Sequence, residues 1–221
     1  MTLAAVAVAA RPLGLAVLGA FHPGPEDAAP PGCGTLVLLG PDGPRLWPIF
    51  RAAPEFADGR LDPLDRWSAR VIGALAGRLD ATPLFPFGGP PHAPFTAWAR
   101  RSGRAWDSPV GLLVHATQGL FVSFRGALAL APRLPLPALP RKPCDGCPAP
   151  CRAACPVGAL TAAGFDPGAC HAFLDTGPGR DCMTRGCGVR RACPVGRDDR
   201  IPAQTAFHMA AFHGRQGGCD A

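Results

Sequence analysis

The sequence lacks tyrosine and asparagine altogether, and it contains one lysine and three isoleucines. These residues have A/T-rich codons, and 28 glycines and 28 prolines accompany the deficit, so the bias is typical of a GC-rich genome. The glycines follow no three-residue period, which excludes collagen. Hydrophobic residues make up 48% of the 221 positions, more than a disordered chain contains. We therefore expect one folded domain and a smaller second one.

Long apolar runs are also missing, since none approaches the roughly 18 residues that a membrane-spanning helix needs. The first ten residues are apolar, but no basic segment precedes them, and Arg11-Pro12 interrupts the run before any cleavage site. The sequence therefore predicts no membrane association and a cytoplasmic location.

Strong charge of either sign is scarce, with 17% charged residues and a net charge of +6. Within residues 1–143, the only tight basic cluster is Arg100, Arg101 and Arg104, flanked by Trp98 and Trp106. A nucleic-acid surface normally needs a stripe of basic residues with aromatic platforms. The cluster is more typical of a solvated helix face, and no nucleic-acid partner is expected from composition.

Ten cysteines are the most informative feature of the chain. Cys33 and Cys219 are isolated, and the other eight fall within 50 residues. In a secreted chain such a cluster would indicate disulfides, but without a secretion signal clustered thiols more often bind metal. The eight are Cys144, Cys147, Cys151, Cys155, Cys170, Cys182, Cys187 and Cys193.

Their spacing favours iron–sulfur clusters. The run from Cys144 to Cys155-Pro156 has the order of ferredoxin modules, in which three close thiolates bind one cluster and the cysteine before proline binds the other. Cys193-Pro194 repeats the dipeptide, so eight thiolates match two [4Fe–4S] clusters. Two zinc sites would also use all eight, although zinc modules usually show two Cys-x2-Cys pairs and only one is present.

Two departures from the ferredoxin pattern stand out. Three residues, instead of two, separate Cys147 from Cys151. Further along, Arg190 occupies the position between Cys187 and Cys193 where a Cys-x2-Cys pair would place a ligand. A cation cannot bind a cluster iron, so another thiol must replace it, and Cys182 is the candidate.

This segment resembles the dicluster module of epoxyqueuosine reductases and, more broadly, bacterial ferredoxin-type proteins with two [4Fe–4S] clusters. The similarity lies in the four-cysteine run, the lone Cys170, Gly186-Cys187 and the terminal Cys193-Pro194. It implies that one cluster binds Cys144, Cys147, Cys151 and Cys193. It implies that the other binds Cys155, Cys170 and Cys187, with Cys182 in the place vacated at Arg190.

The segment before the cysteines has a mixed α and β pattern. Asp62-Pro63 indicates a helix start with a capping carboxylate, followed by an apolar stripe through Leu64, Trp67, Val71, Leu75 and Leu79. Apolar runs bounded by Gly and Pro indicate buried strands. We predict helices over residues 2–10 and 94–101, strands over 13–21 and 35–39, and an antiparallel pair of strands over 110–115 and 120–130.

Short pieces of this segment resemble CblC-type cobalamin-processing reductases and the related corrinoid domain of reductive dehalogenases. They are residues 108–115 and 119–126, the helix start at 62–65 and the linker at 139–143. The resemblance implies a nitroreductase-like α+β fold that holds cobalamin or FMN, with His115 and Arg125 as candidate cofactor-binding residues. The epoxyqueuosine reductase acid has no counterpart before Cys144, so no catalytic residue is predicted.

The leading functional prediction is an electron-transfer protein that serves redox partner proteins. The alternatives are an oxidoreductase whose clusters reduce a bound corrinoid or flavin, with tRNA as partner if it acts like epoxyqueuosine reductase, and a zinc-stabilised interaction module. The predicted fold class is α+β, a nitroreductase/CblC-like domain followed by a ferredoxin-like dicluster module. The predicted boundaries are 1–131 for the first domain, 132–143 for a Pro-rich linker, 144–197 for the cluster module and 198–221 for a C-terminal helix and tail.

Overall fold

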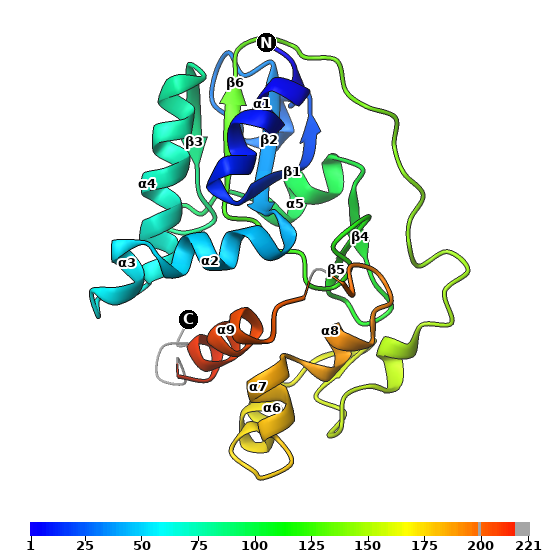
Figure 1. The fold of residues 1–221 in the computed structure, drawn as a ribbon. Coiled ribbons are helices and arrows are strands. Elements are labelled where there is room, and N and C mark those ends of the chain that lie inside the picture. Colours follow the sequence, from blue (N-terminus) through cyan, green and yellow to red (C-terminus); the bar gives the residue numbers. More distant parts are fainter. Residues whose placement is uncertain (199, 215–221) are drawn as a thin grey trace. The chain divides into compact units, whose positions relative to one another are not determined.

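The computed structural model describes residues 1–198 and 200–214, and it shows a mixed α+β chain that divides into two compact units (Figure 1). The first unit comprises Met1–Trp106 and Ser123–Pro140. The second comprises Asp107–Val122 and the chain from Arg141 onward. Residues 107–122, which the sequence analysis placed in the N-terminal domain, thus group with the cysteine-rich segment. None of the described helices is long and apolar enough to span a bilayer.

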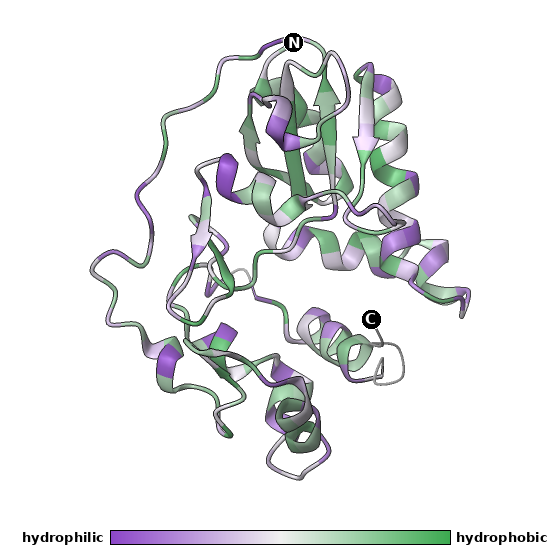
Figure 2. Cartoon of the chain, turned by 180° about the vertical axis from the view of Figure 1, so that it is seen from behind, coloured by the Kyte–Doolittle hydropathy of each residue, from purple (hydrophilic) through white to green (hydrophobic). Residues whose placement is uncertain are grey.

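A four-stranded antiparallel sheet forms the centre of the first unit, in the order β1-β2-β6-β3. The inner strands β2 and β6 are buried almost throughout, as expected for apolar runs covered on both faces. These strands are mostly green in the hydropathy colouring (Figure 2). The edge strand β3 accommodates Pro83, which has no N–H to donate. The strands are β1 (Leu15–Phe21), β2 (Thr35–Pro41), β3 (Ala81–Leu84) and β6 (Gly126–Leu130).

Helices pack on this sheet, with α4 against β3 and β6, and α1 and α5 against β1. Gly19 in β1 permits the last contact, because a Cβ there would lie 2.6 Å from Ser102 Oγ at the end of α5. The helices are α1 (Leu3–Ala10), α2 (Leu46–Arg51), α3 (Pro54–Ala57), α4 (Pro63–Arg78) and α5 (Phe95–Arg101), with short 3-10 helices at Arg11–Leu13, Pro25–Asp27 and Gly43–Arg45. β4 (Ala105–Asp107) lies where the chain leaves the unit.

Helix α4 begins at the predicted residue, but the predicted cap is wrong. Asp62 has a left-handed backbone with φ of 50°, and its side chain makes no capping hydrogen bond. Instead the Asp62 carbonyl accepts from the N–H groups of Asp65 and Arg66 at 3.1 and 3.0 Å. The apolar stripe is confirmed from Leu64 to Leu75, whereas Leu79 lies beyond the helix and is half-buried.

The predicted antiparallel pair over residues 110–130 is wrong. Within residues 110–115 the strand β5 covers Leu113–His115, and Gly119 makes an isolated bridge to His115. β6 starts at Gly126 and pairs with β2 and β3. A strand that is buried on both faces gains most from two neighbours, and a hairpin partner at 110–115 would supply only one.

The proline-rich residues 132–143 are extended, as their composition predicts. Their first part is bonded to the first unit. Thr35 Oγ1 donates to the Pro132 carbonyl at 2.9 Å and accepts from the Leu134 N–H at 2.8 Å. Leu134 is buried, so this stretch contributes to the core of the first unit.

A buried indole connects α5 to the 3-10 helix Pro25–Asp27. Trp98 is 1% exposed, and its Nε1 donates to the Asp27 carbonyl at 2.7 Å. The Asp27 carboxylate in turn accepts from Arg101 and from the Gly24 N–H. These bonds fix the loop between β1 and β2 to the helix.

We expect Trp98→Phe to lower the free energy of unfolding by about 1–3 kcal/mol, because the buried Asp27 carbonyl loses its donor. Urea denaturation followed by circular dichroism measures the change. An unchanged midpoint would show that another group replaces the indole N–H.

Candidate metal centre

The second unit consists of short elements joined by tight loops. They are β5 (Leu113–His115), a 3-10 helix (Pro150–Ala153), β7 (Leu160–Thr161), β8 (Gly164–Phe165), α6 (Pro167–Leu174), α7 (Arg180–Arg185), α8 (Gly188–Ala192) and α9 (Pro202–Gly214). The eight clustered cysteines all lie here. All nine cysteines within the described part of the chain are free thiols, and Cys219 lies outside it.

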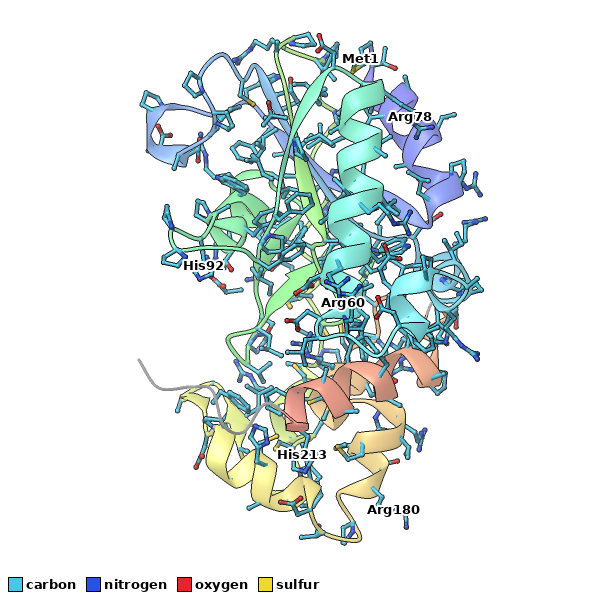
Figure 3. The ribbon with its side chains drawn as sticks, turned by 90° about the vertical axis from the view of Figure 1, so that its left-hand side faces the viewer. Met1, Arg60, Arg78, His92, Arg180 and His213 are labelled. Carbon is cyan, nitrogen blue, oxygen red and sulfur yellow. The ribbon has the colours of Figure 1, made fainter. Side chains whose placement is uncertain are left out.

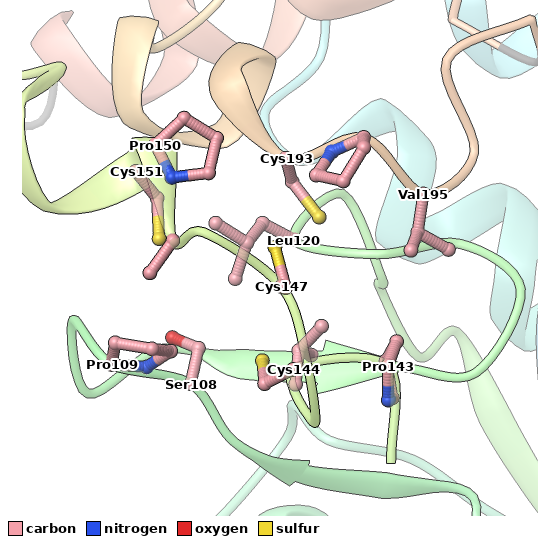
Figure 4. A pocket seen from close by; sticks show the side chains of 13 residues that line it. Ser108, Pro109, Leu120, Pro143, Cys144, Cys147, Pro150, Cys151, Cys193 and Val195 are labelled. Atoms are coloured by element: carbon pink, nitrogen blue, oxygen red, sulfur yellow. The ribbon is translucent and has the colours of Figure 1, made fainter. Parts of the chain in front are cut away.

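Four of the cysteines line one hollow of the second unit (Figure 4). Cys144 and Cys147 lie on one turn, closed by a 3.1 Å bond from the Cys147 N–H to the Cys144 carbonyl. Cys151 is in the following 3-10 helix, and Cys193 follows α8. The hollow thus gathers the four thiols that the resemblance assigns to one cluster.

The opposite wall of this hollow comes from residues 107–122. Ser108, Pro109, Val114 and Leu120 line it, together with prolines and Val195 from the cysteine loops. Apart from the thiols and the Ser108 hydroxyl, the lining side chains are apolar. The sequence did not predict that these residues line the hollow, because their apolar pattern indicates only a strand.

Gly119 leaves room for the Cys193 sulfur. Its φ is +57°, and a Cβ at this position would lie 2.9 Å from Cys193 Sγ and 2.5 Å from the Val195 carbonyl oxygen. A side chain here would therefore both strain the backbone and press on the thiol. The chain approaches Cys193 as closely as a glycine allows.

The other four cysteines come from four segments of the same unit. Cys155 follows the 3-10 helix Pro150–Ala153, Cys170 is on α6, the buried Cys182 is on α7, and Cys187 directly precedes α8. The start of α8 lies against the residue before Cys155, since a Cβ on Gly188 would be 3.0 Å from the Ala154 carbonyl. The sequence places Cys155 and Cys187 far apart, and this contact brings their neighbours together.

Electrostatics divide the thiols into the same two sets. Burial raises the pKa of Cys144, and the nearby thiols of Cys147, Cys151 and Cys193 raise it further, against an opposing effect of Lys142. Burial also raises the pKa of Cys151. For Cys170, burial followed by the charges of Cys187, Cys155 and Cys182 raises the pKa to about 11. Cys182 is therefore close enough to Cys170 to influence it, as its assignment to that set requires.

Helix α9 packs against α7, which carries Cys182, and its last residues contact α6, which carries Cys170. His213 Nδ1 lies 3.1 Å from Nδ1 of His171, the residue after Cys170. His213 Nε2 is 2.8 Å from an Asp175 carboxylate oxygen. Phe212 stacks on His171 with ring centroids 4.4 Å apart. Figure 3 labels His213 on this helix, beside the segment that carries α6. These contacts hold the helix that carries Cys170.

The two candidate cofactor-binding residues lie in different units, and each is engaged within its own. His115 is buried, and its Nδ1 accepts from the Thr117 and Gln118 N–H groups at 3.2 and 3.3 Å. Arg125 donates to Asp65 and to Ser68 Oγ, and lies over the Phe87 ring. These bonds stabilise a turn at His115 and a partly buried ion pair between Arg125 and Asp65.

Within the described residues, no group of three or more His, Cys, Asp or Glu side chains converges to hold one metal ion. A zinc ion needs donors about 2.0–2.3 Å from a single point. A cubane cluster is bound by one thiolate on each of four irons, so its thiols stand farther apart. The four-cysteine hollow offers four thiols and an apolar lining, a donor set whose chemistry suits iron.

Comparisons with protein-family models, with curated proteins and with solved structures found no significant match.

Proposed function

We propose that the chain is an electron-transfer protein whose second unit carries two [4Fe–4S] clusters in a ferredoxin-like dicluster module. The observation that supports this most directly is the hollow lined by Cys144, Cys147, Cys151 and Cys193. The electrostatic coupling of Cys170 to the other three thiols supports a second site. Each cluster, when bound, would accept and release one electron at a time.

The chain's own residues prepare the thiols for such a group. Burial and neighbouring thiols keep Cys144, Cys151 and Cys170 protonated when nothing compensates their charge. Cysteine binds metal as a thiolate, so binding of a cluster would release the protons of these thiols. The positive charge of the iron would then stabilise the thiolates. The apolar lining from Val114, Leu120 and Val195 limits water around the first set.

Anaerobic purification tests the proposal. We expect a brown protein with about eight irons per chain and matching inorganic sulfide, since each cubane contains about four irons. Reduction should produce an EPR signal. A colourless protein with stoichiometric zinc would contradict the proposal and support the zinc-stabilised module instead.

The same preparation distinguishes electron transfer to a protein partner in the cytoplasm from the alternative reductase. Added cobalamin or FMN should leave its own absorbance unchanged if the first unit holds neither. A saturable absorbance shift would favour the corrinoid- or flavin-dependent oxidoreductase, with or without tRNA as substrate.

A further inference from the structure

Two arginines of the second unit, Arg190 and Arg200, lie near the clustered cysteines, although an arginine cannot bind iron. Arg190 stands on α8, three residues after Cys187, so both lie on one side of the same helical turn. Arg200 contacts the loop that follows Cys193. Each belongs to a different set of thiols.

The guanidinium of Arg190 is held by the main chain. Its Nη1 donates to the Leu120 carbonyl at 2.7 Å, and Leu120 itself lines the four-cysteine hollow. Among the described residues, no carboxylate lies within ion-pair distance of Arg190. Arg190 lies one helical turn after Cys187, the N-cap residue of α8. Burial lowers the pKa of Arg190, and the negative charge of the Cys187 thiolate opposes that shift. An arginine remains protonated under these conditions, so its charge is not neutralised locally.

Arg200 is held in the same manner. It donates to the carbonyls of Arg191, Cys193 and Val195 at 2.7, 2.5 and 2.9 Å. Its guanidinium also lies 4.9 Å from the centre of the Phe121 ring. Its Nε is buried and has no hydrogen-bond partner among residues 1–198 and 200–214.

A carbonyl cage of this kind fixes a cation without cancelling its charge, whereas a carboxylate partner would cancel it. Arg185 shows the difference, because it pairs with Asp181 at 3.1 Å and its side chain is 64% exposed. A fixed, partly desolvated charge acts over several ångströms through a low effective dielectric. Reduction adds one negative charge to a cluster, so a nearby cation stabilises the reduced state.

We propose that Arg190 and Arg200 raise the reduction potentials of the two clusters, Arg190 acting on the one that includes Cys187 and Arg200 on the one that includes Cys193. The proposal rests on the proposed function. It explains why the ligand position of the ferredoxin pattern holds an arginine: this residue contributes a charge where the pattern has a thiolate. Both arginines act through the field at the cluster and bind no iron.

The test is an EPR-monitored redox titration of the anaerobic holoprotein and its variants. We expect Arg190→Gln to lower one of the two potentials, with the reduced-to-oxidised ratio of that cluster falling about tenfold at a fixed applied potential. For a one-electron couple this corresponds to about 59 mV. Arg200→Gln should lower the potential of the other cluster, the one that includes Cys193, because Arg200 donates to the Cys193 carbonyl.

Lysine variants separate charge from structure. Arg190→Lys and Arg200→Lys keep the charge but lose the planar fork, so each should restore most of the wild-type potential. If a glutamine variant fails to bind its cluster, the lysine variant at the same position provides the test. A reduction potential equal to that of the wild type supports the proposal. A reduction potential lowered as much as was expected for the glutamine variant overturns it.

Arg185→Gln is the matched control, and its potentials should equal those of the wild type. The proposal is overturned if both glutamine variants shift no more than this control, or if both shift the same cluster. Failure of the proposed function itself is recognised separately, because the wild-type protein would then contain no iron to titrate.

Discussion

A Cys182→Ala variant purified without oxygen is expected to retain about four of the eight irons per chain, because it loses one of two cubanes. Cys182 is 7% exposed on α7, and its charge contributes to the raised pKa of Cys170. No other cysteine of the described residues is left to complete this set, since Cys33 lies in the first unit. Iron and sulfide analysis measures the loss, and EPR of the reduced protein should show one remaining cluster.

Cys33→Ala provides the control for this experiment. Cys33 lies just before β2, and we expect the variant to keep about eight irons. Full iron retention in Cys182→Ala would show that the second cluster takes its fourth ligand elsewhere. Loss of all iron would mean that the two sites do not load independently.

Gly119→Ala is expected to remove the cluster of the four-cysteine hollow and to leave the other in place. The new methyl group would lie 2.5 Å from the Val195 carbonyl oxygen, which belongs to the main chain, and 2.9 Å from Cys193 Sγ. Relief requires a shift of the main chain at Val195 and of the Cys193 side chain, which displaces the thiol from its place in the hollow. Iron analysis should therefore show about half of the wild-type content.

Gly111→Ala is a matched control from the same segment. Gly111 also has a positive φ, of +75°, but a Cβ there meets no atom within 4 Å. The two variants share the backbone strain, of about 1–2 kcal/mol, and differ in the contact with Cys193. We expect Gly111→Ala to keep both clusters with a modestly lowered thermal midpoint. Equal iron contents in the two variants would show that the hollow tolerates a displaced Cys193.

Local patterns predicted the elements whose causes are local. The apolar spacing from Leu64 to Leu75 identifies α4, and the buried runs identify β1 and β2. The partner of β6 could not be predicted, because it depends on which of several apolar strands lies beside it. Residues 110–115 had the right composition for that role, but pairing with β2 and β3 buries β6 on both sides.

The candidate site was predictable to a similar degree. Cysteine spacing predicts a dicluster module, and this stays a prediction. The resemblance groups Cys144, Cys147, Cys151 and Cys193, and these four line one hollow. The wall of residues 107–122 left no signal in the sequence, since Ser108 and Leu120 are chemically unremarkable and act through position alone. The sequence excluded Arg190 as a ligand, and the structure adds that its guanidinium donates to the Leu120 carbonyl.

The chain passes from the first unit to the second at Asp107, returns at Ser123 and passes across again at Arg141. The second unit, which contains the clustered cysteines, is therefore made of two separate segments of the chain. A fragment beginning at Arg141 would encode all eight clustered cysteines yet omit Ser108, Val114, Leu120 and the glycine that makes room for the Cys193 sulfur. The cysteine-rich end alone would therefore lack one wall of the four-cysteine hollow.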